Sequence, residues 1–134
     1  HLAKREFASL SGGQRQLILI ARAIASECKL ILLDEPTSAL DLANQDIVLS
    51  LLIDLAQSQN MTVVFTTHQP NQAVAIANKT LLLNKQNFKF GETRNILTSE
   101  NLTALFHLPM FEQQAQYKES FFTHFVPLYK TLLK

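Results

Sequence analysis

Two short runs of apolar residues constrain the fold of this chain more than any other feature. Leu30–Leu33 is continuously apolar, and Met61–Thr66 is rich in β-branched and aromatic side chains. Runs of this length are typical of strands that are buried on both faces of a parallel sheet. A stretch with helical spacing of its apolar residues separates them, and a second helix and a third strand at Lys79–Lys85 follow. Strand, helix, strand, helix, strand is the pattern of an α/β fold with a parallel sheet. We therefore expect a parallel sheet with flanking helices.

Each apolar run is followed by polar side chains. Asp34 and Glu35 come directly after the first run, and the second run ends in Thr66, Thr67 and His68. In open parallel sheets, ligands bind beyond the carboxyl ends of the strands. Because both polar clusters lie at such ends, the pattern predicts that they contribute to one site.

Caps, spacing and chain breakers predict the remaining elements. Ser11 and Gln14 have the spacing of a capping box, and the apolar residues that continue to Ile24 predict a helix buried on most faces. Pro36 ends the first strand because proline cannot donate to a ladder. The other expected elements are a helix from Asp41 to about Gln59, a helix from Pro70 to Ala77, strands at Lys79–Lys85 and Asn87–Phe90 joined near Gln86, a turn at Gly91, a helix at Ser99–Leu108, and a Phe-rich strand or hairpin before Pro127.

Composition and charge exclude several classes of protein. The 134 residues are 47% hydrophobic and 17% charged, which excludes a disordered chain, and a net charge of +1 is too balanced for a general nucleic-acid binder. The single cysteine, Cys28, excludes an internal disulfide and suits a reducing compartment. No segment reaches the ~18–20 apolar residues of a membrane span. We expect one folded unit in the cytosol, and His1 in place of Met indicates a processed or partial chain.

The segment Leu10–Gln14 is a candidate anion site at the start of the first helix. Its adjacent glycines, Gly12 and Gly13, leave backbone N–H groups unobstructed, and the positive end of the helix dipole lies behind them. The hydroxyl of Ser11 adds a further donor for phosphate. Taken alone, the same pattern also fits a capped helix after a flexible turn.

The Asp34-Glu35 pair and His68 are candidate groups for phosphate chemistry. Asp34 can hold a hydrated Mg²⁺, and Glu35 can take a proton from an attacking water. A neutral His68 imidazole can donate to a phosphate oxygen and orient that water. Each group alone also has an ordinary structural interpretation: a solvated turn for the carboxylates, a loop histidine for His68 and an N-cap for Asp41.

Taken together in their order, four motifs resemble the ATP-binding cassette (ABC) ATPase family. They are LSGGQ at Leu10–Gln14, DEP at Asp34–Pro36, SALD at Ser38–Asp41 and TTH at Thr66–His68, within a match that runs from His1 to about His68. The resemblance implies that the first motif contacts the γ-phosphate of ATP held by a second subunit, and that the SALD loop crosses the dimer interface. It also implies Asp34 as the Mg²⁺ ligand, Glu35 as the catalytic glutamate and His68 as the residue that senses the γ-phosphate. The site residues that it implies are Ser11, Gly12, Gly13, Gln14, Asp34, Glu35, Asp41 and His68.

The resemblance also implies a phosphate-binding loop, an aromatic platform for adenine and a glutamine loop, and these are absent from these 134 residues. No G-x-x-x-x-G-K-[ST] occurs, since the glycines stand at positions 12, 13 and 91. That loop cradles the β-phosphate and supplies a lysine. The chain is therefore expected to be the C-terminal half of an ABC ATPase domain with a P-loop NTPase-type parallel sheet. Within it, residues 1–26 are the signature loop and helix, 27–97 the α/β core and 98–134 a C-terminal extension. Alone, it is expected to be inactive and to leave a sheet edge open.

The resemblance implies the ATP-hydrolysing subunit of an ABC transporter, with ATP and Mg²⁺ as cofactors. Two such subunits close head-to-tail over ATP and drive transmembrane permease subunits from the cytoplasmic face of the plasma membrane. The stretch Gly12–Ala23 is similar to bacterial importers of metal chelates (iron–siderophore, cobalamin or molybdate), and molybdate or tungstate is the expected cargo. Two alternatives stay open: a non-transport ABC ATPase of DNA repair or translation, and a non-catalytic fragment that dimerises with an intact subunit. The near-neutral charge argues against a nucleic-acid partner.

Overall fold

The computed structural model describes residues 6–85, 87–129 and 131. The chain divides into two compact units, His1–His68 and Gln69–Lys134. Within the described residues, the strands form three two-stranded sheets. None of the helices among these residues has the length and apolar content that a membrane span requires. His1, where the family resemblance begins, and Gln86, the expected link between two strands, lie outside the described residues.

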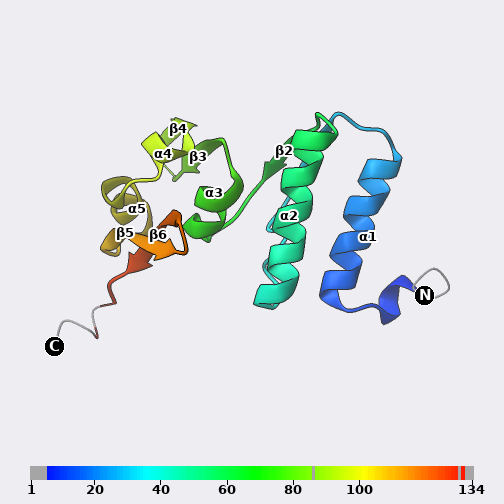
Figure 1. Cartoon of the computed structure of the whole chain (residues 1–134), viewed down its shortest axis with the longest axis horizontal. Coiled ribbons are helices and arrows are strands. Elements are labelled where there is room, and N and C mark those ends of the chain that lie inside the picture. Colours follow the sequence, from blue (N-terminus) through cyan, green and yellow to red (C-terminus); the bar gives the residue numbers. More distant parts are fainter. Residues whose placement is uncertain (1–5, 86, 130, 132–134) are drawn as a thin grey trace. The chain divides into compact units, whose positions relative to one another are not determined.

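The first unit is a β-α-β arrangement preceded by a helix (Figure 1). Its two strands pair in parallel, with Leu30 opposite Thr62 and Leu33 opposite Phe65. The helix between the strands packs on the second one and buries side chains at helical spacing, which confirms the expected α/β pattern. The elements are η1 (Phe7–Ser9), α1 (Gly12–Ala25), β1 (Leu30–Leu33), α2 (Leu42–Ser58) and β2 (Thr62–Phe65), and the side chains that α2 buries are Val48, Leu52 and Leu55.

The burial predicted for this unit is wrong for both strands and for the first helix. Leu30 and Leu32 of β1 are 51% and 70% exposed, whereas Ile31 between them is 5% exposed. Alternate side chains of a strand face opposite sides, so within the described residues only one face of β1 is covered. In β2, Val64 is 49% exposed, so that strand is not buried on both faces either. In α1, all of which the structure describes, Ile20 is the one buried residue. An apolar pattern shows what an element can bury, whereas actual burial depends on which other elements cover it.

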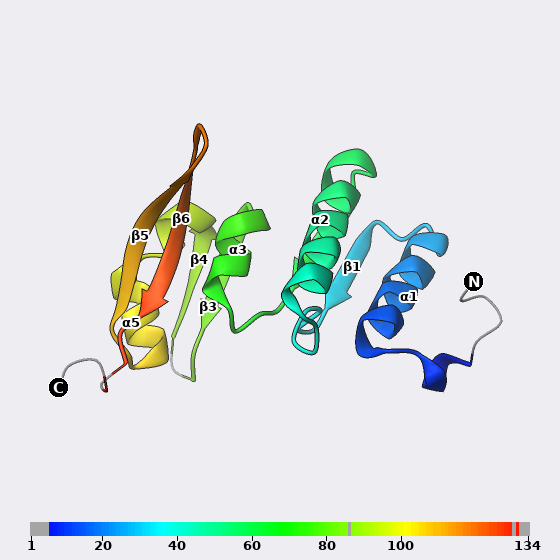
Figure 2. The same ribbon diagram turned by 60° about the horizontal axis from the view of Figure 1, so that its bottom comes forward.

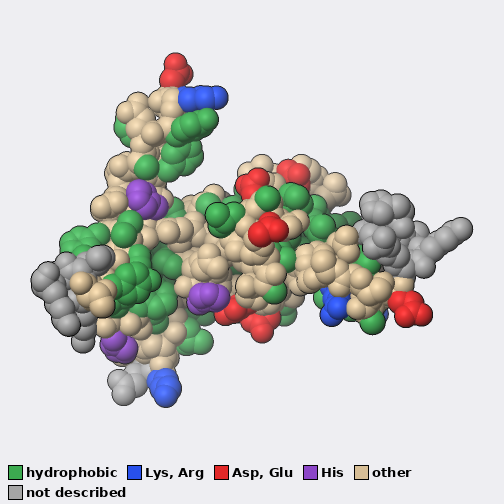
Figure 3. All heavy atoms as spheres, turned by 90° about the horizontal axis from the view of Figure 1, so that it is seen from below, with side chains coloured by type: hydrophobic (Ala, Val, Ile, Leu, Met, Phe, Trp, Pro, Cys, Tyr) green, Lys and Arg blue, Asp and Glu red, His purple; other side chains and the backbone are tan. Residues whose placement is uncertain are grey.

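The second unit combines two antiparallel hairpins with helices (Figure 2). Its buried core draws on α3, α5, both strands of the second hairpin and the end of α4, and consists of Ala73, Leu97, Leu102, Met110 and Phe125. The outer half of the second hairpin exposes apolar side chains (Figure 3), among them Tyr117, Phe121 and Phe122. The elements are α3 (Pro70–Ile76), β3 (Lys79–Leu83), β4 (Phe88–Glu92), α4 (Thr93–Ile96), α5 (Ser99–Phe106), β5 (Met110–Tyr117) and β6 (Ser120–Pro127).

Two features of this unit differ from the sequence prediction. Within the described residues, β3 pairs antiparallel with β4 and does not extend the parallel sheet of β1 and β2. Gly91 lies inside β4, opposite Thr80, and not in a turn. A Cβ at Gly91 would lie 3.3 Å from the Ile96 side chain, so the glycine lets α4 pack closely on the strand. The Phe-rich tail is confirmed as part of a hairpin.

Candidate functional site

The Asp34-Glu35 pair follows the last residue of β1, at a point where the chain turns. Glu35 has a φ of 42°, in the left-handed region that residues with a side chain rarely adopt. Its carbonyl accepts from the N–H of Ser38 at 3.1 Å, which closes a turn directly after the strand. Both carboxylate side chains are exposed at the carboxyl end of β1. This is the place where an α/β sheet binds its ligands.

The polar residues after β2 meet this pair. Leu33 lies opposite Phe65 in the parallel register, so the residues that follow the two strands are neighbours. The Nδ1 of His68 lies 3.0 Å from Oε1 of Glu35, and the two side chains are 60% and 43% exposed. The structure thus brings Glu35 and His68 together, as the strand order predicts, and leaves both accessible to a ligand.

Thr66 makes a second set of hydrogen bonds between the residues after β2 and the Asp34-Glu35 pair. Its hydroxyl donates to Oδ1 of Asp34 at 2.5 Å and accepts from the N–H of Glu35 at 2.9 Å. Its own N–H donates to the carbonyl of Leu33 at 2.9 Å. In the sequence Thr66 is one member of a polar cluster, and no spacing rule shows that its hydroxyl lies between two residues more than 30 positions earlier. The strand register is what places it there.

The start of α1 holds a second group of predicted site residues. Ser11 is the N-cap, and its Oγ accepts from the N–H of Gln14 at 3.3 Å. In return, Oε1 of Gln14 accepts from the N–H of Ser11 at 3.1 Å, which confirms the capping box. The cap uses the Ser11 hydroxyl as an acceptor, so its proton remains for donation to an anion.

The Ser38–Asp41 segment lies against the start of α1. A Cβ at Gly13 would lie 3.1 Å from Cδ2 of Leu40, and a Cβ at Gly12 would lie 3.8 Å from the carbonyl oxygen of Ala39. The absence of a side chain at Gly13 therefore gives Leu40 its place beside the helix. The two segments for which the family resemblance implies contacts across a dimer are neighbours in this unit.

Asp41 is the N-cap of α2. Its Oδ1 accepts from the N–H of Asn44 at 2.8 Å, and its Oδ2 accepts from Nδ2 of Asn44 at 2.9 Å. The first of these bonds, and then the second, hold the pKa of Asp41 below its ordinary value because they favour the charged carboxylate. The structural interpretation of Asp41 as a cap is confirmed, and a contact with nucleotide stays a prediction.

Arg15 is a residue of this region that the sequence patterns did not single out. Its Nε donates to the carbonyl of Leu10 at 2.9 Å, and its Nη2 donates to the carbonyl of Ala8 at 2.8 Å. Its guanidinium carbon also lies 5.9 Å from the centre of the Phe7 ring. These contacts hold the segment before Ser11 against α1 and so fix the direction in which the chain enters the helix. An arginine directly after the LSGGQ motif is the sequence signal for this role.

The residues around Asp34 do not form a metal cage of their own. In the part of the chain that the structure describes, no group of three or more His, Cys, Asp or Glu side chains is arranged to hold an ion. Mg²⁺ is usually held by one or two carboxylates together with substrate phosphates and waters. An exposed aspartate at a strand end fits that mode of binding, in which the nucleotide supplies further ligands.

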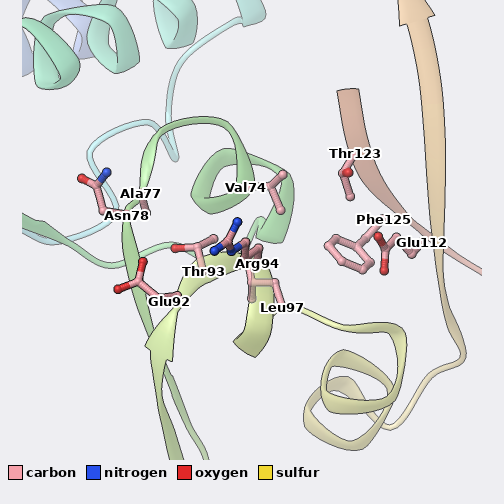
Figure 4. A pocket seen from close by; sticks show the side chains of 10 residues that line it. All are labelled: Val74, Ala77, Asn78, Glu92, Thr93, Arg94, Leu97, Glu112, Thr123 and Phe125. Atoms are coloured by element: carbon pink, nitrogen blue, oxygen red, sulfur yellow. The ribbon is translucent and has the colours of Figure 1, made fainter. Parts of the chain in front are cut away.

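A separate pocket of about 310 Å³ lies within the second unit (Figure 4). Thr93 and Arg94 line it from α4, and Glu112 and Phe125 line it from the β5–β6 hairpin. None of the predicted site residues is among its lining residues. The pocket is therefore distinct from the predicted nucleotide site.

Comparison with known proteins adds to this geometry. The family described as "ABC transporter" matches residues 1–38. The molybdate import ATP-binding protein MolC of Haemophilus influenzae is 98% identical over 134 residues, which are 100% of this chain and 53% of that protein. A solved structure of a metal-chelate type ABC transporter in an inward-facing conformation is 98% identical, with a TM-score of 0.96 over 98% of this chain and 53% of that chain.

A more distant solved structure shares the fold as well. It is a dimeric ATP-binding cassette bound to ADP and Pi, 34% identical, with a TM-score of 0.61 over 69% of this chain and 40% of that chain. The similarity to MolC extends over both units and is not confined to the motifs. The chain spans about half the length of the curated relatives it matches.

Proposed function

Because this chain belongs to the ABC transporter family of ATP-binding proteins, we propose that the complete protein hydrolyses ATP to drive the import of a small solute. The observation that carries the proposal is the contact between Glu35 and His68 at the carboxyl ends of two parallel strands. The contact joins a base to a phosphate-binding side chain at the edge where such sheets bind ligands. Hydrolysis of a phosphoanhydride needs this kind of positioning more than covalent chemistry.

In the proposed mechanism, Glu35 is the general base. As a water oxygen bonds to the γ-phosphorus, the bond from that phosphorus to the β–γ bridging oxygen breaks and ADP leaves with the bridging oxygen. The water proton passes to the Glu35 carboxylate, which is exposed and already hydrogen-bonded to His68. His68 acts as a neutral imidazole with one N–H: with the proton on Nδ1 it donates to Oε1 of Glu35, and with the proton on Nε2 it donates to a γ-phosphate oxygen. The histidine thus orients the base in the first form and the phosphate in the second.

The remaining site residues have electrostatic roles in this proposal. Asp34 is the residue that would hold Mg²⁺ together with the phosphates, and the ion supplies neutralisation of phosphate charge when it is bound. The Ser11 hydroxyl, the first-turn N–H groups of Gly12 and Gly13, and the side-chain NH2 of Gln14 contact the γ-phosphate of a nucleotide on a second copy of the subunit, while the Gln14 N–H stays in the cap. Asp41 is assigned to the loop between the two copies of a head-to-tail dimer, and the existence of a dimeric relative bound to ADP and Pi supports the pairing of two subunits.

We assign molybdate, or a related oxyanion or metal chelate, as the cargo. The support is the similarity to a molybdate import protein and to a metal-chelate type transporter. The complete protein is proposed to lie on the cytoplasmic face of the plasma membrane, bound to transmembrane permease subunits. Similarity to an import protein over the whole chain favours transport over DNA repair or translation.

The test of the proposed function is Glu35→Gln in the complete ATP-binding protein assembled with its permease. General-base catalysis typically contributes about 10²–10⁴-fold, so phosphate release is expected to fall by that factor. ATP binding is expected to persist because the phosphate contacts are retained. Glu119→Gln, at the tip of the β5–β6 hairpin, is the control and is expected to behave as wild type. Undiminished turnover in the Glu35→Gln variant would remove Glu35 from the role of base.

The 134 residues alone are proposed not to bind nucleotide tightly. They contain no phosphate-binding loop with a lysine, so Asp34 and Glu35 have no bound phosphates to act on. Calorimetric titration of the isolated chain with Mg-ATP is expected to show no micromolar binding. Micromolar affinity would contradict the proposal that tight binding of nucleotide requires a phosphate-binding loop outside these 134 residues.

A further inference from the structure

We propose that Thr66 is a positioning residue for the Asp34-Glu35 pair, a role that its hydroxyl performs from the end of β2. The inference rests on the proposed function, because it concerns the two carboxylates that ATP hydrolysis would use. Neither the sequence motifs nor the related proteins assign a role to the Thr66 side chain. Three hydrogen bonds join Thr66 to the segment Leu33–Glu35.

The directions of these hydrogen bonds are fixed by chemistry. The Glu35 backbone N–H can only donate, so the Thr66 oxygen accepts from it at 2.9 Å. A hydroxyl has one proton, and that proton is then directed to Oδ1 of Asp34 at 2.5 Å. The Thr66 backbone N–H donates to the Leu33 carbonyl at 2.9 Å and so continues the hydrogen-bond ladder of the two strands. This bond fixes the position of the Thr66 backbone, from which the side chain extends. One side chain thus binds both members of the pair.

The backbone of Glu35 explains why such a restraint is needed. Its φ of 42° lies where an L-residue is disfavoured, and a conformation of that kind persists only when the surroundings hold it in place. Thr66 holds the main chain of Glu35, and His68, two residues further on, holds its carboxylate at 3.0 Å. The segment after β2 therefore binds both the backbone N–H and the carboxylate of Glu35.

The hydrogen bond to Asp34 has a different consequence. With Oδ1 engaged by Thr66, rotation of the Asp34 carboxylate is restrained, and Oδ2 is the oxygen left without this bond. Residues that orient a metal-binding carboxylate typically change affinity or activity about 10–100-fold when they are replaced. A valine at position 66 has nearly the same shape as threonine but makes neither hydroxyl contact, whereas a serine makes both.

The experiment compares Thr66→Val, Thr66→Ser and Thr62→Val in the complete ATP-binding protein with its permease. Thr62, at the start of β2, is exposed and lies on the same side of the strand, and its hydroxyl makes no hydrogen bond within the described residues, so it is the matched control. The measurements are kcat and KM for Mg-ATP, the melting temperature, and hydrogen exchange in the peptide Leu33–Ser38 without nucleotide.

Thr66→Val is expected to lower kcat by about 10–100-fold with little change in KM. Exchange in the Leu33–Ser38 peptide is expected to become faster, while the melting temperature stays close to that of Thr62→Val. Thr66→Ser is expected to restore most of the rate and the slow exchange. The inference is overturned if Thr66→Val matches Thr62→Val in kcat, if the serine variant is as slow as the valine variant, or if the loss of rate only follows a loss of stability.

The exchange measurement separates this inference from the proposed function. If the wild-type protein shows no ATPase activity, the proposed function fails, but faster exchange in Thr66→Val alone still supports the role of the hydroxyl. Unchanged exchange in that variant overturns the inference even when the wild-type protein is an active ATPase.

Discussion

The Glu35 backbone has an unfavourable conformation that its neighbours offset. A non-glycine residue in the left-handed region costs about 1–3 kcal/mol, and Glu35 has a φ of 42°. The other described non-glycine residues with positive φ lie at ends of elements or in the hairpin turn, and they are Glu27, Asn60, His107 and Lys118. Glu35 instead follows a strand and is held by hydrogen bonds to Thr66, His68 and Ser38. Strain at this residue fits the role of a positioned base.

The Asp41 cap leads to a prediction about how the stability of the chain depends on pH. Its pKa in the folded chain lies below the ordinary value of 3.8, chiefly because the Asn44 N–H bonds to the carboxylate. A lowered pKa means that the cap contributes stability above that ordinary value and loses it as the pH falls through the lower, folded value. Asparagine caps helices about as well as aspartate but does not titrate.

We therefore expect Asp41→Asn to melt at nearly the wild-type temperature at neutral pH. Below pH 3.8, the melting temperature of the wild type is expected to fall more steeply than that of the variant. Circular dichroism melts over a series of pH values measure this difference. Parallel pH profiles for the two proteins would show that the cap bond does not influence the titration of Asp41.

At the scale of elements, helix starts agree closely with the residues that predict them. α1 begins after Ser11 and α2 after Asp41, and both side chains accept from the N–H three residues on. α3 begins at Pro70, which fits the first helical position because its missing N–H has no partner there. α4 has only four residues and no side-chain cap, so no pattern in the sequence marks it. Local chemistry fixes the capped helices and leaves the short one to packing.

Ser11 allows the structural and the proposed functional roles of a cap to be separated. Ser11→Ala removes the oxygen that accepts from Gln14 and is expected to lower the free energy of unfolding by about 0.5–2 kcal/mol. Ser11→Asp keeps the cap, so its stability is expected to remain near that of wild type. The added negative charge would face the proposed phosphate site, so ATP turnover is expected to fall in this variant.

Chemical denaturation and phosphate release of the complete protein measure the two effects of the Ser11 substitutions. An unchanged stability of Ser11→Ala would show that the cap bond contributes nothing. Wild-type turnover of Ser11→Asp would place the bound phosphate away from this loop.

At the scale of the whole molecule, exposed apolar sheet faces are the main feature. In the first unit, Leu30, Leu32 and Val64 are exposed on β1 and β2. In the second unit, Leu81 lies opposite Phe90 and Leu83 opposite Phe88, and these four side chains are between 53% and 71% exposed. Contiguous apolar faces of this kind mark surfaces that pack against other protein. The described residues alone do not cover them.

The isolated 134-residue chain is therefore expected to self-associate. The double substitution Leu83→Lys and Phe88→Glu places opposite charges on two neighbouring strands and removes exposed apolar area. Because the new side chains are well solvated, we expect light scattering to show a shift toward the monomer. Gln114→Lys with Gln116→Glu, on exposed polar positions of β5, is the matched control and is expected to leave association unchanged. A wild-type chain that stays monomeric at high concentration would contradict the expectation.

The sequence by itself determined the order of the main elements, the helix caps and the identity of the conspicuous site residues. These depend on neighbours within a few positions: Ser11 with Gln14, Asp41 with Asn44, and the apolar runs that stop before Asp34 and Thr67. Short-range chemistry of this kind is the same in any fold, so the residues alone predict it.

Only the tertiary structure decided the strand partners, the actual burial and the contacts across long separations. Sequence patterns place β3 in a parallel sheet and cover both faces of β1, whereas β3 pairs with β4 and Leu32 is exposed. The Thr66 hydroxyl lies between Asp34 and Glu35 because the parallel register sets the ends of β1 and β2 side by side. Such a contact depends on where two strands are placed in space, and no pattern of neighbouring residues contains that information.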